Sequence, residues 1–164
     1  MTSDSAPCSE RTGRVIRLEL SQPTPSLNTI SGHHWGKLRK YKRQASQEIL
    51  AQIGRQAPAK PFSKARVEIA RYGQGKELDH DNLVGGAKAL VDCLKKTEVK
   101  VCVSRKTHAT SIRVTNSFGR GIIEDDDKEH IVLVVTSIHV KTKLSCRTIV
   151  VITELLPCPG EPPE

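Results

Sequence analysis

Four stretches of the chain carry the apolar pattern of β-strands, in which one side of an extended backbone is buried. They are residues 14–20, 65–72, 130–140 and 147–154. The last two are rich in β-branched residues, which favour a pleated and partly buried backbone. A lysine-rich turn with Lys141 and Lys143 lies between them.

Two other stretches repeat apolar residues at steps of three and four, which predicts helices with one buried face. In the first helix this face consists of Trp35, Leu38, Tyr41, Ala45, Ile49 and Ile53. In the second it consists of Leu83, Ala87, Leu90 and Leu94. We therefore expect Trp35 to belong to the core.

The order of these elements predicts a small α/β (α+β) domain. Strand, helix, strand, helix, an inserted stretch and two strands together favour one mixed β-sheet with two main helices on it. The insertion, residues 97–120, is basic, and two of its segments could form an extra hairpin. We expect a disordered leader at residues 1–13, one domain at 14–156 and a proline-rich tail at 157–164.

Composition argues against a membrane or a disulfide-rich protein. The longest strongly apolar stretch, residues 131–135, is far shorter than the roughly 20 residues of a membrane-spanning helix. The five cysteines are scattered, with no CxxC pair and no zinc-ligand spacing. We expect reduced thiols in a cytoplasmic protein.

Charge is distributed unevenly along the sequence. The net charge is +8. Residues 20–76 include eleven basic residues and only two acidic ones. Lys37, Lys40 and Arg43 belong to a basic run on the first helix. Such a run either binds nucleic-acid phosphates or forms an ordinary solvated helix face.

Six of the seven aspartates lie between residues 79 and 127, and five of these six form two clusters. Asp79 and Asp81 precede the second helix, where Asp81 or Asn82 could act as its N-cap. The second cluster is residues 124–127. Two carboxylates 4 Å apart repel by about 4 kcal/mol at an effective dielectric of 20. If the fold joins the clusters, a cation or raised pKa values are needed.

A hard divalent ion such as Mg²⁺, or Mn²⁺ in its place, would meet that need, because it takes oxygen ligands. Lys88 follows Asp81 by two helical turns and so returns to nearly the same face, where it could neutralise a phosphate. The alternative is structural: the first cluster is a loop with a helix cap, and the second is a solvated turn. We expect a structural role for Asp92, which lies eleven residues past Asp81.

Two blocks of the sequence resemble the RusA family of Holliday-junction endodeoxyribonucleases. The first runs from Asp79-x-Asp81-Asn82-Leu83 through Gly86-x-Lys88 to Asp92-x-Leu94, and the second is Gly121-Ile122-Ile123-x-Asp125-Asp126. A proline-rich loop with Asn28 precedes both, as is typical of the family. The chain departs from the family pattern between Leu94 and Gly121, where members often need only a few residues.

The resemblance implies a homodimeric, Mg²⁺-dependent nuclease that resolves four-way DNA junctions by paired symmetric nicks. Residue by residue, it implies metal ligation by Asp79, Asp81 and Asp126, with Asp125 beside them, and a catalytic Lys88. It implies a role in DNA recombination and repair in the cytoplasm of a bacterium, with a gene that is bacterial or carried by a phage. Two alternatives stay open: a non-catalytic DNA-binding protein of the same fold, and a metal-dependent phosphohydrolase acting on RNA or small phosphate esters.

Overall fold

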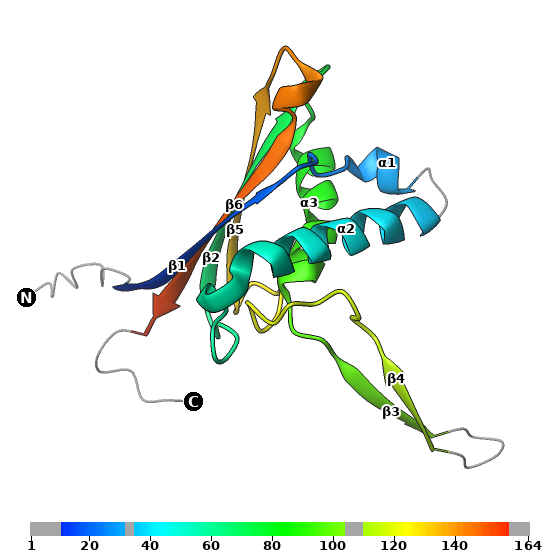
Figure 1. The fold of residues 1–164 in the computed structure, drawn as a ribbon, viewed down its shortest axis with the longest axis vertical. Helices are drawn as coiled ribbons and strands as arrows, with labels where there is room; N and C mark the ends of the chain where they lie inside the picture. Colours follow the sequence, from blue (N-terminus) through cyan, green and yellow to red (C-terminus); the bar gives the residue numbers. More distant parts are fainter. Residues whose placement is uncertain (1–10, 32–34, 104–109, 158–164) are drawn as a thin grey trace, which may run out of the picture.

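The computed structural model describes residues 11–31, 35–103 and 110–157. These residues form an α+β domain, as the sequence predicts, with a mixed sheet, helices on one of its faces and a two-stranded ribbon that projects from it (Figure 1). The elements are β1 (Arg11–Leu20), α1 (Leu27–Ser31), α2 (Trp35–Ile53), β2 (Ala65–Gly73), α3 (His80–Leu94), β3 (Val99–Val103), β4 (Thr110–Val114), β5 (Ile131–His139) and β6 (Arg147–Leu156). Short 3-10 turns occupy Gly54–Gln56 and Lys143–Ser145.

The sheet formed by the described residues has the strand order β1-β6-β2-β5. β6 pairs antiparallel with both β1 and β2, whereas β5 pairs parallel with β2. Val67 of β2 lies opposite Leu133 on one side and Ile152 on the other. A parallel pair needs a long crossover. Here the crossover contains α3 and the ribbon, and α3 therefore packs on the sheet.

The core lies between the sheet and the helices α2 and α3. Alternate residues of the strands face it, and the largest fully buried side chains include Ile16, Leu18, Val67, Ile69, Val150 and Ile152 from the strands and Ile49, Leu90 and Leu94 from the helices. Each such side chain stabilises the fold by about 1.5–3 kcal/mol relative to exposure. No helix in the described part of the chain is long and apolar enough to cross a membrane.

The expectation that Trp35 belongs to the core is wrong. Trp35 is the first residue of α2 and is 66% exposed, with the Arg39 guanidinium 6.0 Å from the centre of its ring. The helical periodicity is correct, but full burial of the apolar face begins only at Ala45, further along the helix. Tyr41 is partly buried against the core, so the amphipathic pattern begins more than one turn before the part of α2 that packs there.

The termini and the early loop also differ from the expectation. β1 begins at Arg11, three residues before the expected start, because Arg11 and Thr12 pair with the end of β6. The expected proline-rich loop contains the short helix α1. The rest of the leader, and the tail from residue 158, lie outside the described residues.

The sequence allowed a hairpin in the insertion, and β3 and β4 pair there as an antiparallel ribbon. Val99, Val101 and Val103 of β3 lie opposite Val114, Ile112 and Thr110 of β4. Residues opposite one another share a face of the ribbon, and successive residues alternate between faces. One face is therefore aliphatic, with its five aliphatic residues 49–75% exposed, and the other carries Lys100 and Arg113. We call the first the apolar ribbon face.

Cysteines in the described residues are free thiols. They are Cys93, Cys102 and Cys146. Burial raises the pKa of Cys93 to about 12, so its thiol is unreactive at neutral pH. Cys8 and Cys158 lie outside the described residues.

Gly86 allows α3 to approach the loop before α1. A Cβ at Gly86 would lie 1.7 Å from the carbonyl oxygen of Pro25, whereas one at Gly85 would meet only the Leu27 side chain, at 3.0 Å. We expect Gly86→Ala to lower the free energy of unfolding by about 2 kcal/mol, because overpacking against backbone forces a shift. Gly85→Ala is the control, since helix propensity gains about 1 kcal/mol and a side chain can move. Urea denaturation measures both, and equal stabilities would contradict the close approach.

Candidate functional site

The first cluster of aspartates forms the start of α3. Asp79 is the N-cap, in place of the expected Asp81 or Asn82, because the helix begins at His80. Its Oδ1 accepts a hydrogen bond from the Asn82 N–H at 2.9 Å, and its Oδ2 accepts one from Asn82 Nδ2 at 2.8 Å. These bonds, the backbone one first, lower the pKa of Asp79. Asp81 lies in the first turn and is exposed, where the helix dipole favours a negative charge.

The early loop lies beside this cluster. The Asn28 N–H donates a hydrogen bond to Asn82 Oδ1 at 3.3 Å. The missing side chain of Gly86 lets the backbone at Pro25 contact α3 about one turn further on. The structure therefore brings Asn28, an expected DNA-binding residue, next to the first block of the resemblance.

The second block is joined to the other end of α3. The N–H groups of Arg120, Ile122 and Gly121 donate hydrogen bonds to the carbonyl oxygens of Cys93, Leu94 and Lys95, at 2.8–3.0 Å. The first two are the last carbonyls of the helix and the third belongs to its C-cap, so none has a partner within the helix. Ile122 and Ile123 are fully buried. We call this set of bonds the α3 seam.

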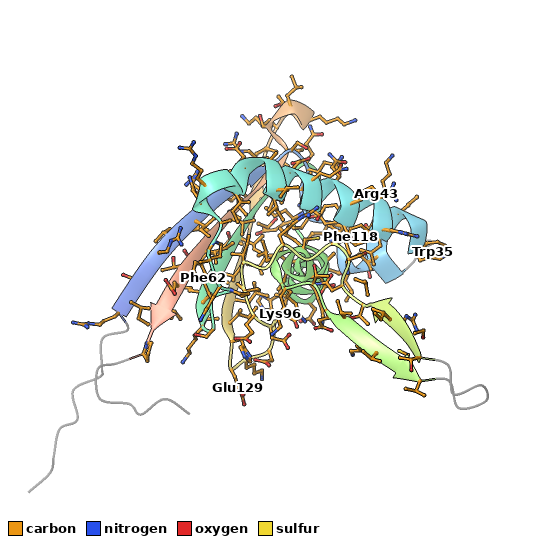
Figure 2. All side chains as sticks on the ribbon, turned by 60° about the horizontal axis from the view of Figure 1, so that its bottom comes forward. Trp35, Arg43, Phe62, Lys96, Phe118 and Glu129 are labelled. Carbon is orange, nitrogen blue, oxygen red and sulfur yellow. The ribbon has the colours of Figure 1, made fainter. Side chains whose placement is uncertain are left out.

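Two further features fix the α3 seam in place. Gly121 has a φ of +69°, which favours glycine. On the other side, the Phe62 N–H donates to the Ile122 carbonyl oxygen at 2.8 Å, and the Glu124 N–H donates to the Phe62 carbonyl oxygen at 3.1 Å. In Figure 2, Phe62 lies on the sheet side of α3, and Phe118 lies close to α2 and α3. The position of the acidic cluster is therefore set by backbone bonds on both flanks.

The α3 seam places Asp125 and Asp126 against Lys95, which follows the last residue of α3. Lys95 Nζ lies 2.7 Å from Asp125 Oδ1 and 2.8 Å from Asp126 Oδ1, and the Lys95 side chain is only 14% exposed. Burial alone would lower the pKa of Lys95, but the hydrogen bonds to the two carboxylates outweigh it and raise that pKa. The same lysine, with the Asp126 N–H, holds the pKa of Asp125 well below its usual range.

Sequence reasoning missed Lys95. It is separated from Asp126 by 31 positions, and the insertion between them hid their proximity. One signal was present: a lysine at the end of a helix interacts favourably with the carboxyl end of the helix dipole. That signal places a lysine near the helix end but does not name its partner.

The third consecutive aspartate has a different role. Asp127 Oδ1 accepts hydrogen bonds from the N–H groups of Glu129 and His130, at 2.9 and 3.0 Å, and lies 2.6 Å from His130 Nδ1. The side-chain bond from His130 lowers the pKa of Asp127 and raises that of His130. Asp127 therefore caps the turn before β5, while Asp125 and Asp126 face α3.

Lys88 connects the two blocks. Its Nζ lies 3.9 Å from Asp126 Oδ2, and its side chain is 72% exposed. Lys88 is seven residues from Asp81 and seven from Lys95, which corresponds to about 10 Å of helix in each direction. The expected catalytic lysine therefore contacts one expected metal ligand, and its ammonium stays open to solvent.

The expected metal ligands lie in two groups. Asp79 and Asp81 are at the start of α3, and Asp125 and Asp126 are beside its end, where Lys95 follows Asp81 by about 21 Å of helix. Among the described residues, no three His, Cys, Asp or Glu side chains are grouped so as to hold one ion. Carboxylates are the donors that Mg²⁺ takes. Their arrangement in this chain, however, does not fit an ion held jointly by Asp79, Asp81 and Asp126.

The basic run on α2 divides into exposed and paired residues. Lys37, Lys40 and Arg43 are exposed and follow one another at steps of three; Arg43 is labelled on α2 in Figure 2. Lys42 is instead 2.5 Å from Asp92 Oδ2, so that Asp92 ties α2 to α3 as its structural role requires. Lys37 also lines a pocket between α1 and α2. The charges of Lys37, Lys40 and Arg43 are therefore exposed on the surface of α2.

Comparison of the chain with models of protein families, with curated proteins and with solved structures found no match.

Two substitutions can separate the role of Asp79 as an N-cap from the role of its negative charge. We expect Asp79→Ala to lower the melting temperature by a few degrees, because α3 loses its N-cap. Asp79→Asn keeps an oxygen acceptor at the cap, so its melting temperature should stay near that of the wild type. Differential scanning calorimetry measures both. If both substitutions destabilise the protein equally, the charge of Asp79 matters more for folding than its cap.

Proposed function

We propose that this protein is an Mg²⁺-dependent endodeoxyribonuclease that resolves four-way DNA junctions by paired symmetric nicks. The observation that carries the proposal is the contact between Lys88 and Asp126, which joins the two blocks of the RusA resemblance. The proposed setting is recombination and repair in the cytoplasm of a bacterium, with the gene bacterial or carried by a phage.

Five exposed residues have proposed roles in binding or cutting DNA. Lys37, Lys40 and Arg43 bind phosphates along the DNA backbone, where each contact releases counterions and strengthens binding at low salt. Asn28 lies beside the first block and contacts the strand that is cut. The Lys88 ammonium stabilises negative charge that develops on the attacked phosphate.

The metal requirement rests on the chemistry of the donors. All four proposed ligands, Asp79, Asp81, Asp125 and Asp126, are carboxylates, and Mg²⁺ or Mn²⁺ prefers such oxygens. The described residues of one chain do not group them around a single ion. The proposed part of the metal is tested directly by chelation.

A second candidate is a non-catalytic DNA-binding protein of the same fold. It is favoured by the separation of the carboxylates into two groups and by Lys95, which already neutralises one of them. The two candidates share the basic surface of α2. They differ in whether the acidic residues are needed for cleavage.

Cleavage of a synthetic four-way junction separates these candidates. We expect the wild type to cut it with Mg²⁺ and to stop with EDTA. Lys88→Met should slow cleavage about 100-fold or more, as loss of a group that stabilises developing charge does. Asp81→Asn and Asp126→Asn should also lose cleavage, while Asp81→Asn binds the junction at least as well, because a negative charge near the phosphate is removed.

Asp127→Asn is the matched control, because it removes one charge from the same acidic run at a residue engaged with His130. It should cut at close to the wild-type rate. Binding without cleavage by the wild type in Mg²⁺ would favour the DNA-binding protein. Equal cleavage of linear duplex or RNA would overturn the junction specificity.

We propose that the two copies of the homodimer contact each other through the apolar ribbon face. Two-stranded ribbons are marginally stable alone. The five aliphatic residues of this face are 49–75% exposed in one chain. Nucleic-acid interfaces are polar and positively charged, so DNA is a poor partner for it. A second copy related by a two-fold axis would present the same aliphatic face, and such symmetry suits a substrate with two equivalent strands.

Substitutions on opposite faces of the ribbon test this contact. We expect Ile112→Asp to shift the protein from dimer to monomer, because it places a charge on the apolar ribbon face. Ser111→Asp adds the same charge to the opposite face and should leave the dimer intact. Size-exclusion chromatography with light scattering measures the mass. A monomeric wild type, or equal behaviour of the two variants, would contradict the role of the ribbon.

A further inference from the structure

Asp125 and Asp126 present two carboxylates to one ammonium group. Lys95 Nζ lies 2.7 Å from one and 2.8 Å from the other, within hydrogen-bonding distance of both. Adjacent carboxylates repel each other, and a cation shared between them removes that repulsion. In this chain the shared cation is a side chain.

Lys95 is held firmly by its backbone. Its N–H donates to the Val91 carbonyl oxygen at 3.2 Å, and its own carbonyl oxygen accepts the Gly121 N–H at 2.9 Å. Lys95 also forms an isolated β-bridge with Ile123 in the second block. The residue that carries the ammonium is thus fixed to the segment that carries the carboxylates, which reduces the entropy lost in holding the ion pair.

The two neighbouring lysines differ from Lys95. Lys96 Nζ lies 3.0 Å from Glu124 Oε1, and its side chain is 47% exposed. Lys88 Nζ is 3.9 Å from Asp126 Oδ2 and is 72% exposed. Exposed ion pairs contribute little to stability. Among these three lysines, Lys95 alone is both largely buried and shared between two carboxylates.

We propose that Lys95 is the resident counter-ion of the Asp125–Asp126 pair and the residue that positions Asp126 toward Lys88. Lys95 supplies the positive charge that the two adjacent carboxylates of the second cluster need. The acidic segment therefore folds without metal, and an added divalent ion competes with Lys95 for the same two carboxylates. This inference concerns the folded protein and does not depend on nuclease activity.

Thermal unfolding of the full chain with MgCl₂ or with EDTA tests the proposal. The wild type should melt at the same temperature in both. Lys95→Gln should melt at least about 5 °C lower in EDTA, because two close carboxylates lose their counter-ion. Millimolar MgCl₂ should recover at least half of that loss in Lys95→Gln.

Lys96→Gln is the matched control, because it removes the same charge from the adjacent residue. It should melt near the wild type and show no response to Mg²⁺. The double variant Lys95→Gln/Asp125→Asn removes the repulsion itself. It should therefore be more stable in EDTA than Lys95→Gln, with a weaker Mg²⁺ response.

Lys95→Arg keeps the charge and should retain the insensitivity of the wild type to EDTA, so the proposal stays testable if Lys95→Gln does not fold. A Lys95→Gln protein that melts like Lys96→Gln would overturn the proposal. So would a wild type that is strongly stabilised by Mg²⁺, since Lys95 would then not satisfy the pair. Junction cleavage can fail while this result holds, and the reverse is also true.

Discussion

The α3 seam is the constraint on which the rest of the site depends. Backbone N–H groups of Arg120 and Ile122 satisfy the last two carbonyl oxygens of α3, and that of Gly121 satisfies the carbonyl oxygen of the C-cap residue Lys95. Phe62 bonds to the other flank of the segment. An unpaired carbonyl in this buried place would cost about 1–3 kcal/mol. The seam therefore sets where the chain returns after the ribbon, whatever the insertion does. Asp125 and Asp126 follow directly and meet Lys95 and Lys88.

Charge neutralisation within the chain changes how the acidic clusters are understood. Had the fold joined the two clusters, a cation or raised pKa values would have been needed. The fold instead separates them along α3, caps the helix with Asp79 and pairs Asp125 and Asp126 with Lys95, whose side chain is 14% exposed. Each cluster is thus stable for its own local reason. The catalytic proposal rests on the contact of Lys88 with Asp126 and on the basic residues left open to solvent.

Much of the fold could be predicted because burial on one face leaves a periodic pattern. The strands, α2 and α3 follow from apolar residues at steps of two or of three and four. That periodicity does not say how far a helix packs, so Trp35 was misplaced. Lys95 was missed because its partners lie 30 and 31 positions away, across the insertion at residues 97–120. Local patterns reveal faces and caps, whereas contacts between distant residues depend on the topology.

The central claim is that residues from the two blocks act together on a branched DNA. Mapping the ends of both strands after incubation of a labelled four-way junction with wild-type protein and Mg²⁺ tests it most directly. We expect one nick in each of two opposite strands, at symmetric positions, and intact linear duplex of the same sequence. Tight binding with all strands intact, or cuts of equal frequency in the duplex, would contradict it.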